Sequence, residues 1–211
     1  CKILHLSKGA FFGNYSVELY SVGKLDEKPP VVWLPQNEIG NSATQPTILK
    51  DGPYAGQMAH GDVTHGGLKR VFVEKVNGEY QGVVFPFMQG LEGGTNRLVW
   101  GPDGALYIGC VGSTGNWGQF RKKQWGLQKI KFNGKPTFDL LAIRAKNNGF
   151  ELEFTEPVSD KFGLNPADIK AMTWRYEPTM QYGGPKIDLT ELEILSITPS
   201  SDRKKFFVEL N

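Results

Sequence analysis

The sequence predicts an all-β protein in which about two blades of a partial β-propeller precede an immunoglobulin-like β-sandwich. Three observations predict this class. Of the 211 residues, 26 are Gly, 13 are Pro and 12% are aromatic, which suits short strands joined by many turns. A Gly-Pro-Asp-Gly turn at 101–104 separates two short alternating runs, as in a propeller hairpin. A different series of alternating strands begins after residue 146.

The propeller portion is placed at residues 1–146. Its expected strands lie at 16–22, 31–34, 56–62, 69–76, 80–87, 96–100, 105–109, 126–132 and 138–144. The strands from 31–34 to 80–87 make one blade of about four strands, with Asn77-Gly78 as a hairpin turn. The hairpin at 96–109 opens a second blade, and 126–132 and 138–144 are its outer strands. A long polar loop is expected at 35–54, and loops of that length are often functional.

The sandwich portion is placed at residues 147–211. Phe150, Leu152 and Phe154 alternate with polar residues, which predicts a strand with one apolar face. The stretch 165–168 indicates a turn or a short helical start. Further strands are expected at 172–176, 192–197 and 206–210, and the pattern favours an immunoglobulin-type sandwich.

Charge and cysteine content exclude several classes of protein. A net charge of +2 gives no strong field for nucleic acid or for a membrane surface, and no stretch is long and apolar enough to span a bilayer. Cys1 and Cys110 form neither a metal spacing nor a disulfide framework. Cys1 would suit the lipidated first residue of a surface lipoprotein. We favour a chain that continues into further domains of a larger protein, because residues 2–6 already alternate like a strand.

Several short segments occur in a characteristic order. They are Leu34-Pro35-Gln36, Gly52 to Gln57, Val76 to Gly82, Asn96 to Leu98 with Tyr107 to Gly109, Asn116 to Gly118, and Gly126 to Gln128. In this ordered series, residues 33–146 resemble the last part of the propeller of secreted bacterial proteins of the PQQ-dependent sugar dehydrogenase (glucose/sorbosone dehydrogenase) type.

The resemblance implies a periplasmic or secreted protein that acts on carbohydrate, with pyrroloquinoline quinone (PQQ) and Ca²⁺ on the upper face of the propeller. The catalytic base of such enzymes matches no motif in this chain, and two blades do not close a ring.

His60, Asp62 and His65 form a His-x-Asp-x-x-His motif. Two imidazoles and a carboxylate suit a divalent metal with Asp62 as a ligand, and either histidine could be a catalytic base toward a sugar hydroxyl. The simpler interpretation, which we favour, is a polar loop between glycines.

Gln36, Asn37 and Glu38 lie in the long loop and carry oxygens that suit a sugar or Ca²⁺; a solvated loop is the alternative. Arg97 is assigned a catalytic role toward an anionic quinone or a carboxylate through its guanidinium, and a structural salt bridge explains it equally well.

Two tryptophans, Trp117 and Trp125, lie on the glycine-rich loop 112–126. They suit stacking on a pyranose ring, and the alternative is that they cap the edge of the core.

Three functions are compatible with these features. The first is a segment of a quinone-dependent sugar or alcohol dehydrogenase, incomplete for catalysis by itself. The second is a non-catalytic carbohydrate-binding module of a larger secreted protein. The third is a structural spacer. We favour the first as the ancestry of the chain.

Overall fold

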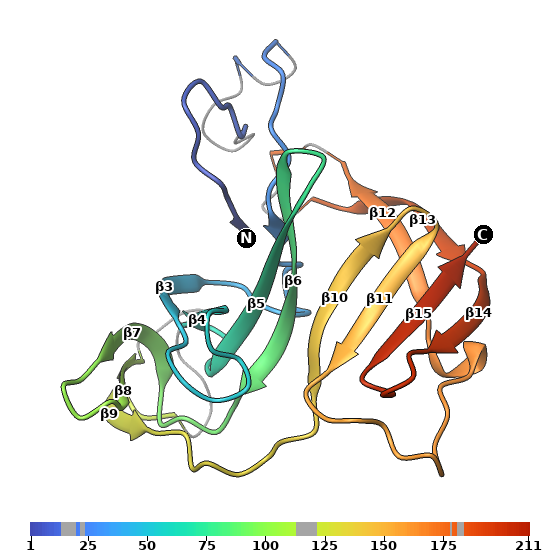
Figure 1. Cartoon of the computed structure of the whole chain (residues 1–211). Coiled ribbons are helices and arrows are strands. Elements are labelled where there is room, and N and C mark those ends of the chain that lie inside the picture. The colour runs from blue at the N-terminus through green and yellow to red at the C-terminus, as the bar shows by residue number, and fades with distance from the viewer. Residues whose placement is uncertain (14–19, 22–23, 113–121, 178, 181–183) are drawn as a thin grey trace. The chain divides into compact units, whose positions relative to one another are not determined.

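The computed structural model describes residues 1–13, 20–21, 24–112, 122–177, 179–180 and 184–211. Over these residues the protein is all-β, with antiparallel pairing in every sheet, which confirms the predicted class at that level (Figure 1). The strand expected at 16–22 lies outside the described residues. Two compact units are present, one formed by Cys1–Ile3 with Val31–Pro136 and the other by Leu4–Pro30 with Thr137–Asn211.

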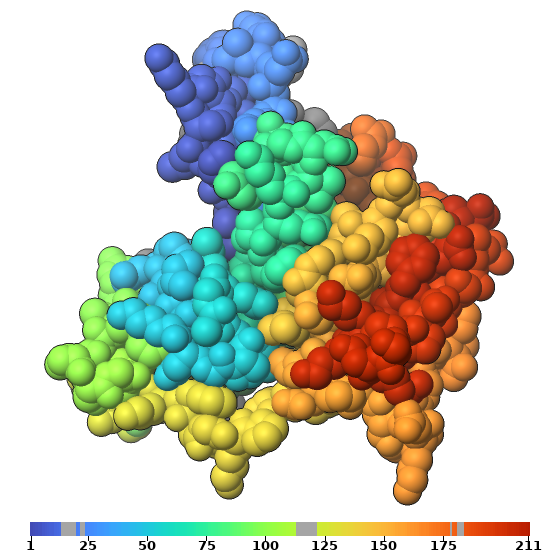
Figure 2. Space-filling model, viewed as in Figure 1, coloured from blue at the N-terminus to red at the C-terminus, as the bar shows by residue number. Residues whose placement is uncertain are grey.

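Three sheets form the first unit, in the orders β1-β2, β3-β4-β5-β6 and β7-β8-β9. The strands are β1 (Lys2–Ile3), β2 (Val32–Trp33), β3 (Ala43–Ile48), β4 (Met58–Asp62), β5 (Leu68–Val76), β6 (Glu79–Met88), β7 (Gly94–Trp100), β8 (Leu106–Val111) and β9 (Trp125–Ile130). The long β5–β6 hairpin is the green segment of Figures 1 and 2. Asn77 and Gly78 turn it with φ of 49° and 91°, as the Asn-Gly dipeptide predicts.

The fourth strand of the first large sheet differs from the prediction. The loop expected at 35–54 contains β3, which pairs with β4, whereas β2 pairs with β1 instead of joining this sheet. Pro46 made a strand hard to predict here, because proline lacks the backbone N–H that a central strand donates to its neighbour. It is tolerated here because β3 lies at the edge of the sheet.

The second predicted blade is also one strand short. The outer strand expected at 138–144 is β10 (Leu140–Lys146), and β10 pairs with β11 (Gly149–Phe154) in the second unit. The sheet β7-β8-β9 therefore has three strands among the described residues. The units divide between Pro136 and Thr137, and the turn near residue 146, where the boundary was expected, joins β10 to β11.

The core of the first unit lies on both faces of β5. On one face, Leu68 packs in a buried cluster with Leu98, Leu106, Ile108 and Cys110 of the β7-β8-β9 sheet. On the other face, Val71 packs with Val31, Val32 and Leu34. Gly61 lies at the contact between the two larger sheets, where a Cβ would overlap the Thr95 side chain. The absence of a side chain at Gly61 therefore allows the sheets to stack closely.

The second unit contains a four-stranded sheet in the order β10-β11-β15-β14 and a two-stranded sheet, β12-β13 (Figure 1). Its remaining elements are η2 (Pro166–Asp168), β12 (Ala171–Tyr176), β13 (Lys186–Leu192), β14 (Ile194–Pro199) and β15 (Lys205–Leu210). The short helical start predicted at 165–168 is the 3₁₀ turn η2. Phe206, 2% exposed, packs edge-on to Phe154 with ring centroids 5.7 Å apart.

Candidate functional site

Asp62 is the centre of the predicted His-x-Asp-x-x-His motif, and it is fully buried at the end of β4. Its Oδ2 accepts the backbone N–H groups of Asn41 (2.9 Å) and Ser42 (3.1 Å), and its Oδ1 accepts that of His65 (2.6 Å). The carboxylate therefore ties the loop before β3 to the turn between β4 and β5. We call Asp62 and these three partners the Asp62 junction.

The buried amines of two lysines, Lys69 and Lys122, share Asp62 as their nearby negative charge. Lys69, on β5 opposite His60, is 3% exposed and donates to the Gly66 carbonyl oxygen at 3.2 Å. Burial lowers the pKa of the Lys69 amine, and the Asp62 charge opposes that effect.

Lys122 precedes β9 and brings its amine to the same turn. Its Nζ is buried and has no hydrogen-bond partner among the described residues, and a Cβ built on Gly66 would overlap it. Burial lowers the pKa of Lys122; the Asp62 charge opposes this, and the charge of Lys69 adds to it. When both lysines are protonated, their two positive charges face the single negative charge of Asp62.

His60 lies on β4 inside the sheet contact and is 2% exposed. Its Nδ1 is 2.8 Å from the Gly61 carbonyl oxygen, so Nδ1 carries the proton of the neutral ring, while the buried Nε2 has no hydrogen-bond partner in the described part of the chain. Burial lowers the pKa of His60, and the contact with Gly61 opposes that effect. A general base must lie within hydrogen-bond reach of the proton that it removes, and solvent does not reach Nε2 here.

The predicted metal site is not assembled. Across the described ranges, no group of three or more His, Cys, Asp or Glu side chains is placed to hold a metal ion. Asp62 uses both oxygens on backbone N–H groups, and His65 contributes one of those N–H groups. The motif thus organises a turn, in line with the simpler interpretation. The motif does not provide the carboxylate-rich set that Ca²⁺ prefers, so it does not fit a Ca²⁺ ion.

The predicted sugar-binding loop forms a tight turn. Asn37 has φ of 63° and its N–H donates to the Gly40 carbonyl oxygen at 3.2 Å, while the side chain of Asn41 donates to Asn37 Oδ1 at 3.2 Å. Gln36 forms an isolated bridge with Gly40, and Glu38 is exposed. These contacts hold the turn together and leave the sugar-binding hypothesis for these residues untested.

Arg97 and Trp125 lie together on one face of the β7-β8-β9 sheet. Arg97 is exposed on β7 and pairs across Gly109 of β8 with Leu127 of β9. Trp125 begins β9, two residues before Leu127, and both of these side chains are 72% exposed. Since alternate strand residues share a face, Arg97, Leu127 and Trp125 lie on the same side. The other predicted tryptophan, Trp117, lies outside the described residues.

Sequence reasoning missed Lys69 and Lys122. The signal for Lys69 was local, because Lys69 and Arg70 interrupt an apolar strand pattern. Arg70 is fully buried, with its guanidinium 4.3 Å from the ring centroids of both Tyr54 and Phe85. Lys122 gave no local signal, because its place beside Gly66 depends on how the sheets stack.

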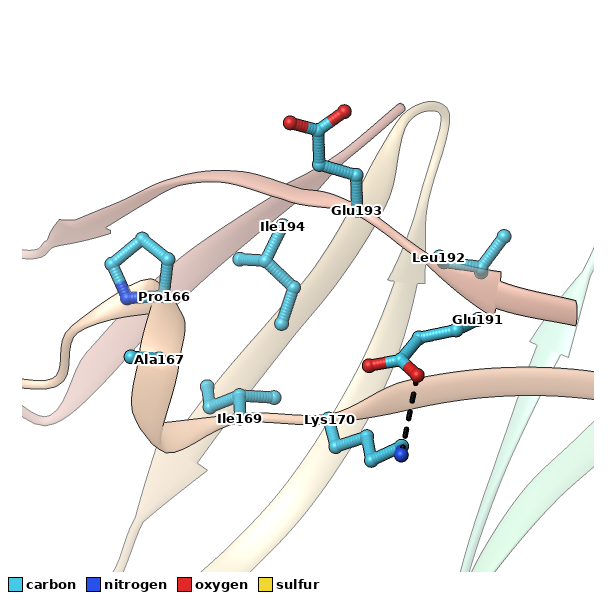
Figure 3. Close-up of a pocket in the computed structure, with 8 residues that line it drawn as sticks. All are labelled: Pro166, Ala167, Ile169, Lys170, Glu191, Leu192, Glu193 and Ile194. Atoms are coloured by element: carbon cyan, nitrogen blue, oxygen red, sulfur yellow. Dashed lines mark ion pairs between the residues drawn. The ribbon is translucent and has the colours of Figure 1, made fainter.

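A separate open pocket lies in the second unit between η2 and the start of β14 (Figure 3). Its lining residues are Pro166, Ala167, Ile169, Lys170, Glu191, Leu192, Glu193 and Ile194. Ile169 and Ile194 point toward one another across it, and Lys170 and Glu191 form an exposed ion pair of 3.2 Å at its side. None of the residues predicted from the sequence to be functional lines this pocket.

Comparison of the chain with protein-family models, with curated proteins and with solved structures gave no match. Within the described part of the chain, the structure contains no helix long and apolar enough to cross a membrane.

Proposed function

We propose that this chain is a segment of an extracytoplasmic protein of the quinone-dependent sugar dehydrogenase type, and that its role there is to bind carbohydrate. This combines the ancestry suggested by the ordered motifs with the second of the three functions, the binding module. The proposal assigns no catalytic step, quinone or Ca²⁺ to the described residues.

The exposed indole of Trp125 carries the proposal. At 72% exposure, on a sheet face beside the equally exposed Leu127, it presents a flat apolar surface to solvent. Such indole faces suit the C–H face of a pyranose ring, because a tryptophan combines a large apolar area with an N–H group. Val99, 63% exposed, lies on the same face and extends the apolar surface.

The buried motif supports a structural role in place of catalysis. His60 and Asp62 are 2% and 0% exposed, and their polar atoms face the protein interior. A sugar hydroxyl would need to displace the stacked sheets to reach His60 Nε2. The exposed face needs no such rearrangement, so binding at Trp125 is the simpler function.

Affinity electrophoresis of the whole chain through gels that contain defined polysaccharides tests the proposal. We expect at least one polysaccharide to retard the native protein and Trp125→Ala to abolish the retardation. Trp33→Ala is the matched control, because Trp33 is also an exposed strand tryptophan of the first unit, at 45% exposure. Equal retardation of the native and Trp125→Ala proteins, or no retardation in any gel, would contradict the proposal.

A further inference from the structure

The Trp125 face carries a cation as well as an apolar surface. Arg97 Nη1 donates to the backbone oxygen of Asn96 at 3.1 Å and to the Asn96 side-chain oxygen at 2.9 Å. Both acceptors are neutral, and no ion pair with a described carboxylate involves Arg97. The guanidinium is therefore an exposed positive charge without a negative partner among the described residues.

Neighbouring lysines differ from Arg97 in this respect. Lys129 pairs with Asp103 at 3.4 Å, and Lys123, just before β9, pairs with Glu92 at 2.5 Å. Arg97 is thus the cation of this sheet whose charge remains available to a ligand, as far as the described residues show.

Gly109 leaves the space between Arg97 and Leu127 open. The three residues lie in one row across β7, β8 and β9, and a Cβ on Gly109 would stand 3.6 Å from the Arg97 Cβ. Adjacent strands are about 4.8 Å apart, so the ends of this row are separated by roughly 10 Å. Trp125 lies about 7 Å along β9 from Leu127. The backbones of Arg97 and Trp125 are therefore about 12 Å apart on this face, a span that the two long side chains and one sugar residue between them can fill.

We propose that this face binds acidic carbohydrate, with a pyranose ring on the Trp125 indole and the carboxylate of a uronic acid on Arg97. The inference rests on the proposed carbohydrate-binding function and names its ligand class. A guanidinium donates two parallel N–H bonds to a carboxylate, which a neutral sugar cannot accept in the same way. Charge complementarity at Arg97 thus favours uronic acids over their neutral counterparts.

Titration calorimetry with two matched ligands tests the inference. The probes are trigalacturonate and α-1,4-galactotriose, which differ in the carboxylate at C6. We expect trigalacturonate to bind the native chain at least tenfold more tightly at low salt, and the difference to shrink as salt screens the charge. Arg97→Gln should remove this preference and leave galactotriose binding unchanged, and Arg97→Lys should restore it in part. Trp125→Ala should weaken both ligands.

The outcomes separate the two proposals. Equal affinities for the two trisaccharides, or a preference that survives in Arg97→Gln, would overturn the acidic ligand class while leaving carbohydrate binding intact. Binding of neither these trisaccharides nor any polysaccharide in the gel series would overturn both. Sedimentation velocity addresses a second copy as the occupant: self-association of the native chain that Trp125→Ala and Arg97→Gln abolish would also overturn both. Circular dichroism confirms that each variant is folded.

Discussion

Replacing Lys122 by methionine should stabilise the protein. Lys122 Nζ is buried beside Gly66 and close to a second lysine, Lys69, and no described residue accepts a hydrogen bond from it. Leaving a buried polar group unsatisfied costs about 1–3 kcal/mol, and methionine keeps the length of the side chain without the amine. Because the rest of the Lys122 side chain is partly exposed, we take the low end, about 1 kcal/mol. For a chain of this size that corresponds to a rise in Tm of roughly 2–4 °C.

The pH dependence provides a sharper test of the same reasoning. Burial lowers the pKa of Lys122 below its ordinary value of 10.5, so the folded state binds this proton less tightly than the unfolded state. The penalty is complete at pH values below the folded pKa and is relieved as the pH rises toward the unfolded pKa. The stability gain of Lys122→Met should therefore be largest near pH 6 and should shrink toward pH 10.

Urea unfolding followed by tryptophan fluorescence at pH 6, 8 and 10 measures both effects. Lys135→Met is the control, because Lys135 is exposed in the segment after β9. A loss of stability in Lys122→Met, or a gain that does not change with pH, would contradict an energetic penalty from the buried Lys122 ammonium. It would mean that the amine has a favourable partner in solution.

Three further substitutions test the site and the core. Asp62→Asn should destabilise the protein by about 3 kcal/mol, because it leaves Lys69 and Lys122 without their counter-charge. Asp51→Asn, at an exposed turn, is the control. Equal urea midpoints for the two variants would contradict the role of Asp62. His60 should stay neutral at pH 7, and because its folded pKa is lowered, the folded state should lose stability as the pH falls below about 6.5. His60→Gln should reduce this acid sensitivity. An NMR titration that shows an ordinary pKa for His60 would exclude His60 as its source. Gly61→Ala should cost about 1–3 kcal/mol because its Cβ would overlap Thr95, whereas Gly163→Ala, with open space around it, should change the Tm little; similar melting curves for the two variants would refute the stacking argument.

The turn residues were the main source of the correct fold predictions made from the sequence. Asn77-Gly78 adopts the expected geometry with two positive φ angles, and Gly104 has a positive φ in the turn at 101–104, because such angles depend on the turn residues themselves. The loop prediction missed β3, and the sheets assigned to β2 and β10 were wrong, because strand pairing depends on contacts between distant segments. Pro46 gives the same local pattern in a loop as in the edge strand β3. The residues of β10 give the same local pattern whichever sheet the strand joins.

The candidate site was predicted only in part, because its arrangement also depends on contacts between distant segments. Trp125 was identified from its residue type, but its place at the start of β9, on the same sheet face as Arg97, follows from the register of three strands. Asp62 was chosen as a metal ligand because of its spacing from two histidines, whereas its oxygens bind backbone N–H groups, which no residue pattern specifies. The sequence did not predict a role for Lys122, because the residues around its amine belong to another sheet.

We propose that ligand binds the exposed face of β7, β8 and β9 and not the buried motif. NMR chemical-shift mapping of the whole chain with trigalacturonate distinguishes these two locations. We predict that the largest changes occur at the Trp125 indole N–H, the Gly109 amide and the Arg97 guanidinium. Changes centred on His60, Asp62 and His65, or no changes at saturating ligand, would contradict it.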